Sequence, residues 1–136
     1  MRKHLCVCLW AGLLCVFVLG CSAENEERVK VQELDFTVTA TENIPNELLV
    51  VLEETKTDAF YRAYSDGEFM YLCVGYGEQA TGGYSITVDD LYLTEEAVCM
   101  ATTLVGPNAA EEVTKMPSYP YVVVCTEYMD KPIVFE

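Results

Sequence analysis

The sequence predicts a mainly β domain, either a small antiparallel β-sandwich or a partly open barrel, with one helix near its N-terminal end. Two observations lead to this fold class. Short apolar runs rich in β-branched and aromatic residues recur along residues 29–136, and turn residues separate them. A single segment, residues 46–56, instead has apolar residues spaced three and four apart, which is typical of an amphipathic helix.

The first predicted strand covers residues 29–41, where apolar and polar residues alternate. The alternation slips by one residue at Gln32-Glu33, so we expect one strand with a bulge at that point. Pro45 then opens the predicted helix, because proline is favoured in the first turn. The acidic residues Glu47 and Glu53 lie on the helix face opposite the leucines.

A hairpin is predicted next, because residues 60–64 and 69–75 flank the turn sequence Ser65-Asp66-Gly67-Glu68. The further predicted strands are residues 83–93, 97–105, 119–128 and 133–135. Residues 108–118 are polar and irregular. So long a loop in a compact chain is a candidate contact surface.

Composition limits the classes of partner. The chain has 136 residues, which predicts one domain, and 51% of them are hydrophobic, enough for a core. It has 22 acidic and 8 basic residues, a formal net charge of −14. Nucleic acid is not expected as a partner, because a surface this acidic repels phosphates. The abundance of apolar residues also argues against a disordered acidic tail.

The first 20 residues are typical of an export signal. Arg2 and Lys3 precede an apolar run over residues 5–19, which is shorter than the ~20 apolar residues of a membrane span. The run ends in Val18-Leu19-Gly20-Cys21, which resembles the bacterial lipobox. We therefore expect cleavage before Cys21 and a diacylglycerol on its sulfur, which would hold the chain at the outer face of a bacterial membrane. An ordinary secretory signal or an uncleaved anchor is the alternative.

The exported chain would consist of an acidic tether, residues 21–28, and a single domain, residues 29–136. Cleavage would remove His4, the only histidine, so catalysis or zinc binding by imidazole is not expected. Neighbouring acids such as Asp89-Asp90 point to opposite faces of a strand and do not converge on one bond. The sequence therefore predicts a protein that is not an enzyme. It also predicts no metal and no cofactor beyond the lipid on Cys21.

Three cysteines follow Cys21 in the chain, namely Cys73, Cys99 and Cys125. Each lies in an apolar, strand-like run, and we interpret all three as buried free thiols that pack as small hydrophobic groups. One disulfide among them and a site in which all three thiolates bind a metal are the alternatives.

Two motifs are more specific than the composition. Thr81-Gly82-Gly83-Tyr84 places two glycines, which permit positive φ, at a sharp reversal. Tyr119-Pro120-Tyr121 places a proline at a strand start, with both tyrosines on one side of the strand. In this order the motifs resemble the C-terminal domain of the PrcB family, over about residues 60–126. Ala80 stands where that family usually has a proline.

The PrcB family is named after a lipoprotein subunit of a surface protease complex. The resemblance implies a protein partner, possibly a surface protease, and an accessory rather than catalytic role. The residues of the two motifs and their loops then either bind the partner or define the fold. These candidates are Gln79, Thr81, Gly82, Gly83, Tyr84, Pro107, Tyr119, Pro120 and Tyr121.

Two other functions are kept as alternatives. The Thr-Gly-Gly-Tyr turn is similar to a loop of chagasin-like inhibitors of cysteine proteases, which predicts protease inhibition, although the other chagasin loop motifs are missing. Exposed tyrosines would also suit a small-ligand or carbohydrate-binding module.

Overall fold

The computed structural model describes residues 28–136. The predicted signal peptide, Cys21 and the predicted tether up to residue 27 lie outside the described residues.

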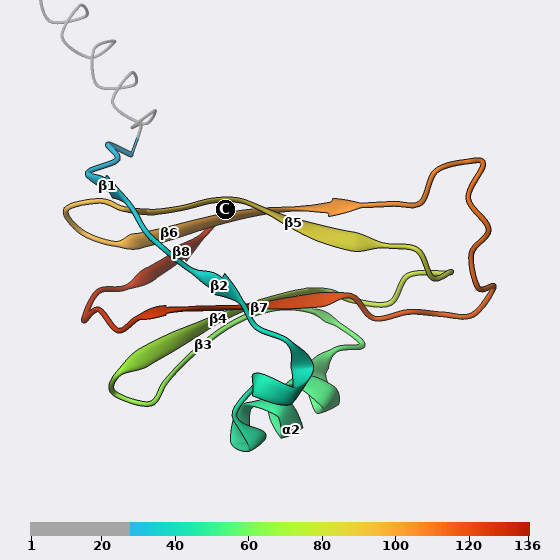
Figure 1. Ribbon diagram of the computed structural model, residues 1–136, viewed down its shortest axis with the longest axis horizontal. Helices are drawn as coiled ribbons and strands as arrows, with labels where there is room; N and C mark the ends of the chain where they lie inside the picture. Colours follow the sequence, from blue (N-terminus) through green and yellow to red (C-terminus); the bar gives the residue numbers. More distant parts are fainter. Residues whose placement is uncertain (1–27) are drawn as a thin grey trace, which may run out of the picture.

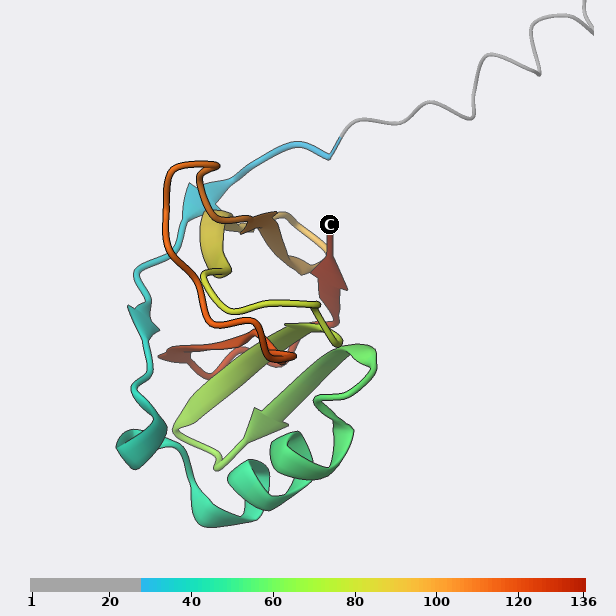
Figure 2. The same ribbon diagram turned by 90° about the vertical axis from the view of Figure 1, so that its right-hand side faces the viewer.

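Two four-stranded sheets pack face to face, and one helix covers the outer face of one sheet (Figures 1 and 2). Sheet A has the strand order β1-β5-β6-β8, and sheet B has the order β2-β7-β4-β3. The helices and strands are, in chain order, β1 (Gln32–Glu33), β2 (Thr37–Val38), η2 (Thr41–Asn43), α2 (Asn46–Thr55), β3 (Ala59–Ser65), β4 (Phe69–Tyr76), β5 (Ser85–Leu93), β6 (Val98–Val105), β7 (Tyr121–Glu127) and β8 (Ile133–Phe135). The two sheets form no closed barrel, so the sandwich prediction is confirmed.

The two central strands of sheet B, β4 and β7, are buried on both faces. Alternate residues of β4 and β7, such as Leu72 and Val124, meet Val98 and Met100 of sheet A in the main core. The residues between them face α2 instead. The core on that side consists of Ile44, Leu48, Leu52, Cys73 and Val123. This double burial explains why the valine run of β7 does not alternate with polar residues.

The prediction of one strand over residues 29–41 is wrong. β1 pairs with β5 in sheet A, whereas β2 pairs with β7 in sheet B, so this segment crosses from one sheet to the other. Leu34 lies between the two short strands, is 7% exposed and packs into the core. The slip in alternation at Gln32-Glu33 therefore marks a change of sheet and not a bulge.

The predicted sandwich was antiparallel, but one pair of strands differs. β8 pairs with β6 in parallel register, with Val98 opposite Ile133.

The predicted helix and the later strands are confirmed to within two residues at each end. The predicted turn is confirmed as well. In it the Asp66 carboxylate accepts hydrogen bonds from the N–H groups of Glu68 (3.0 Å) and Phe69 (2.8 Å). These bonds lower the pKa of Asp66 below its ordinary value.

The three described cysteines are free, as interpreted from the sequence. Cys73 and Cys99 are fully buried, whereas Cys125 is only half-buried. Burial raises the pKa of the Cys73 thiol to about 12 and that of the Cys125 thiol in the same direction.

We expect the free energy of unfolding to decrease as pH rises above 9. The Cys73 thiol titrates near 9.0 when exposed and at about 12 when folded, so the unfolded chain loses this proton first. The contribution of the Cys73 thiol to the free energy of unfolding is therefore complete below pH 9.0 and is lost as pH rises through about 12. Urea denaturation at a series of alkaline pH values measures the decrease, which will be smaller in a Cys73→Ala variant. An identical decrease in the variant would contradict this assignment.

Candidate protein-binding surface

Two loops that are distant in the sequence lie side by side at one end of the sandwich. Gln79 and Ser118 exchange backbone hydrogen bonds of 2.8 and 3.0 Å, and the Gly82 N–H donates to the Thr114 carbonyl at 2.9 Å. We call residues 79–84 and 106–118 together the loop end. In Figure 1 it projects at the right, beyond the strands of both sheets.

The two loops also lie close together at Gly83. Its φ is +88°, a conformation that L side chains rarely adopt. A Cβ atom here would lie 2.5 Å from Val113 Cγ1 and 2.9 Å from Pro107 Cβ. Of the two glycines that permit positive φ in this motif, Gly83 adopts it and Gly82 does not. Tyr84 is half-buried, and its ring packs beside Gly106 on the other loop.

Three polar side chains of the loop end donate hydrogen bonds to backbone carbonyl groups. The Ser118 hydroxyl donates to the Thr81 carbonyl at 2.7 Å. The Gln79 amide donates to the Tyr76 carbonyl at 3.2 Å, and the Thr81 hydroxyl donates to the Gly82 carbonyl at 3.0 Å. These groups hold the loops in shape. The outward surface comes mainly from residues 108–116, and it includes Met116, which is 65% exposed.

The two tyrosines of the second motif lie on one side of the chain, as predicted, and that side faces α2 and the residue that follows it. Tyr121 donates a hydrogen bond to Glu53 on α2, and Tyr119 donates one to Glu78, both at 3.2 Å. The Lys56 ammonium lies 5.6 Å from the centre of the Tyr119 ring and 2.9 Å from a Glu53 carboxylate oxygen. We call these five residues the tyrosine face. It connects the end of α2 to the loop end.

Pro120 precedes β7 directly, so the prediction that it marks a strand start is confirmed. The predicted strand began two residues too early, at Tyr119. Proline has no N–H to donate to a ladder, but its carbonyl accepts a hydrogen bond of 3.1 Å from the Tyr76 N–H. This bond joins the end of β4 to the second motif.

The charges of the tyrosine face suit binding rather than proton transfer. The hydrogen bond from Lys56 lowers the pKa of Glu53. Burial, followed by the bond to Glu53, raises the pKa of Tyr121, and the bond to Glu78 raises that of Tyr119. At neutral pH the Glu53 carboxylate is therefore ionised and both phenols are protonated. Glu53 and the two phenols are therefore not poised to transfer a proton near neutral pH.

Within residues 28–136, no group of three or more His, Cys, Asp or Glu side chains is placed to hold a metal ion. In the same part of the chain, no helix has the length and apolar character needed to cross a membrane.

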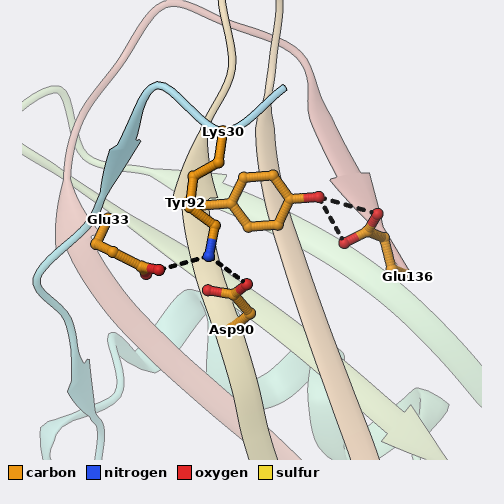
Figure 3. A network of polar contacts seen from close by, with 5 residues as sticks. All are labelled: Lys30, Glu33, Asp90, Tyr92 and Glu136. Atoms are coloured by element: carbon orange, nitrogen blue, oxygen red, sulfur yellow. Dashed lines mark hydrogen bonds and ion pairs between the residues drawn. The ribbon is translucent and has the colours of Figure 1, made fainter. Parts of the chain in front are cut away.

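The chain enters the domain at the other end of the sandwich. Figure 3 shows the contacts that fasten the entering segment to the outer face of sheet A, where Lys30 pairs with Asp90 at 2.8 Å and lies 5.0 Å from the centre of the Tyr92 ring. Arg28 pairs with Glu136 at 3.0 Å, and the Tyr92 hydroxyl donates to the same carboxylate. Tyr92 lies near the C-terminal end of β5, and the loop end lies beyond its N-terminal end. A strand of nine residues separates the two by roughly 30 Å.

The residues of the chain that contact the two motifs were not predicted from the sequence. Glu53 and Lys56 are three apart on a predicted helix, which indicates a helix-surface ion pair. No sequence pattern indicates that this pair meets Tyr119 and Tyr121. The contact of Gly82 with Thr114 also depends on how the two loops pack.

Comparison with known proteins identifies one family. Residues 70–127 match the family model described as PrcB C-terminal. The match runs from β4 to the end of β7, so it includes both motifs and the whole loop end. No curated protein and no solved structure matches the chain.

Proposed function

We propose that the chain is a non-catalytic, protein-binding lipoprotein of the PrcB type, because residues 70–127 match the PrcB C-terminal family model. A diacylglycerol on Cys21 would hold it at the outer face of a bacterial membrane. Its binding surface would be the loop end together with the tyrosine face. The family resemblance makes a secreted or surface protease the first candidate partner, which the chain would accompany as an accessory subunit.

The observation that carries this proposal is the joining of two distant loops into one surface. Backbone hydrogen bonds between Gln79 and Ser118 and between Gly82 and Thr114 hold the loops together. A surface that is ordered before binding loses less conformational entropy when a partner docks. Rigid scaffolds commonly present binding residues on loops in this way.

The position of the entering segment supports the same surface. Arg28 is seven positions after Cys21 in the chain, and such a tether spans at most about 25 Å. The salt bridge between Arg28 and Glu136 fastens the tether's end to the outer face of sheet A. A chain anchored there would turn the opposite, loop end away from the lipid, where a partner could reach it.

Co-purification tests the proposal. The tagged full-length chain would be recovered from native membranes in mild detergent, and its intact mass would show whether Cys21 carries acyl chains. We expect one protein to be recovered with it reproducibly and in stoichiometric amount. Recovery of no reproducible partner would contradict the binding role, and a Cys21 without lipid would contradict the anchor.

A substitution on the outward surface of the loop end should weaken this binding. We expect Met116→Asp to lower the amount of recovered partner by about tenfold or more, because charge at the centre of an interface is costly to desolvate. Val31→Asp is the matched control, since Val31 is 56% exposed but precedes β1 at the other end of the sandwich. Equal losses in the two variants would contradict the placement of the surface.

Protease inhibition is expected to be absent. The Thr-Gly-Gly-Tyr turn is bound along its backbone by residues 106–118, since the Gly82 N–H is occupied by Thr114. It is therefore not a free loop that could enter a protease cleft. Titration of papain-like and subtilisin-like proteases with a micromolar excess of the chain should leave their rates unchanged, and stoichiometric inhibition would favour the chagasin-like alternative.

A further inference from the structure

β3 is an edge strand with an open side. It pairs with β4 along its whole length, from Ala59 opposite Tyr76 to Ser65 opposite Met70. Among the described residues, no strand pairs with its other side. The N–H and C=O groups that point outward from β3 can therefore accept a further strand.

The usual features that protect such an edge are missing from this strand. β3 has seven residues, contains no proline, and pairs with β4 without a bulge. Arg62 is its single charged residue, and the large side chain of Tyr61 is 62% exposed. Natural edges are commonly shortened, bent or covered with charge, so this edge is unusually open to pairing.

A groove lies beside the C-terminal half of β3, where the edges of the two sheets come together. Its volume is about 180 Å³, and it opens to solvent. Ala63 and Met70 line it on the sheet B side, and Ile133 of β8 and Met129 line it on the other. Further along the same two edges, Tyr61 stacks on Phe135 of β8 with ring centres 4.9 Å apart. The groove has room for one apolar side chain.

The charge around this groove is negative. Asp130 lines the groove, and Asp66 follows Ser65, which also lines it. The one cation in the lining, Lys131, donates hydrogen bonds to the carbonyl oxygens of Thr94 (3.3 Å) and Glu95 (2.9 Å) and is thus turned toward another loop. The whole chain has a net charge of −14, so the local and overall fields both favour a cationic ligand.

We propose that the open edge of β3 binds an extended, positively charged segment of a partner protein. The segment would add to sheet B as a fifth strand, through backbone hydrogen bonds, and place one apolar side chain in the groove. This site is separate from the loop end. A second copy of the chain is a poorer occupant, because its own net charge of −14 would be brought against a like charge.

Peptide binding to the full-length chain in detergent micelles tests this site. The probe is a fluorescent seven-residue peptide of alternating valine and lysine, and its counterpart has glutamate in place of lysine. We expect the lysine peptide to bind at least about tenfold more tightly than the glutamate peptide, with affinity that decreases as salt increases. Its NMR footprint should lie on the amides of β3 and on the residues of the groove.

Two variants of one strand provide the control. Ala63→Trp fills the groove, whereas Ala59→Trp places the same side chain on the same face of β3, four residues away and outside the groove. We expect about a tenfold or greater loss of affinity in the first and less than about a twofold change in the second. NMR spectra of the remaining residues verify that both variants are folded.

Several results would overturn the proposal. They are no binding at millimolar peptide, equal binding of the two peptides, a footprint away from β3, or equal losses in the two tryptophan variants. Slow exchange of the outward β3 amides in a chain that sediments as a dimer would also overturn it, because it would assign this edge to a second copy.

Discussion

Leu72→Ala is expected to lower the free energy of unfolding by about 2–5 kcal/mol. Leu72 has no exposed surface and lies in β4, between the neighbouring strands β3 and β7. Its side chain belongs to the core formed by both sheets, so the truncation leaves a cavity where they meet. This loss is a large share of the ~5–15 kcal/mol that stabilises a domain of this size. Urea denaturation measures it directly.

The matched control for this change is Val50→Ala. Val50 is 58% exposed on α2, so its truncation should change the free energy of unfolding by less than about 0.5 kcal/mol. A loss below about 1 kcal/mol for Leu72→Ala would mean that the two sheets do not enclose a common core.

Gly83→Ala is expected to lower the amount of partner recovered with the chain by about tenfold or more. The new Cβ would lie 2.5 Å from Val113 and 2.9 Å from Pro107, so the loop of residues 106–118 must move away from the loop of residues 79–84. The φ of +88° adds a backbone penalty of about 1–2 kcal/mol for any residue with a side chain. Co-purification from native membranes measures the effect on binding.

Gly67→Ala separates the two causes. Gly67 has a φ of +95° in the turn between β3 and β4, and a Cβ atom there would have no neighbour within 4 Å. This variant therefore carries a similar backbone penalty without moving the loop end. We expect it to be destabilised but to recover the partner as the wild type does. Equal loss of the partner in both glycine variants would show that stability, and not the shape of the loops, controls binding.

The strands and the helix could be predicted because local patterns determine them. The turn at Asp66-Gly67 separates two apolar runs, and Pro45 begins the helix, so these elements follow from neighbouring residues. The path of residues 29–41 could not be predicted in this way. A single buried residue, Leu34, sits between two strands that are each only two residues long, and nothing local indicates that they pair in different sheets.

Strand direction and the contacts of the site also depend on tertiary packing. Periodicity does not distinguish a parallel from an antiparallel partner, so the parallel pairing of β8 with β6 had no sequence signal. The Thr-Gly-Gly-Tyr and Tyr-Pro-Tyr motifs mark a turn with positive φ at Gly83 and a strand start after Pro120, because glycine and proline have few conformational substitutes. The contact of Tyr121 with Glu53 on α2 requires two segments 68 residues apart to be placed side by side.

The two ends of the sandwich differ in the contacts that they make. At one end, Arg28 and Lys30 hold the entering segment against sheet A. The other presents two joined loops, and α2 and the tyrosine face lie beside them. The net charge of −14 favours cationic partners over anionic ones. We propose that the protein works by holding a partner near the membrane.

Site-specific photo-cross-linking in intact cells tests the central claim most directly. A photoreactive amino acid would replace Met116 at the loop end in one strain and Val31, at the other end of the sandwich, in another, two positions of similar exposure (65% and 56%). We expect irradiation to link position 116, and not position 31, to one partner protein that mass spectrometry then identifies. Cross-links to the same protein from position 31 alone, or equally from both positions, would contradict the assignment of the loop end as the binding surface.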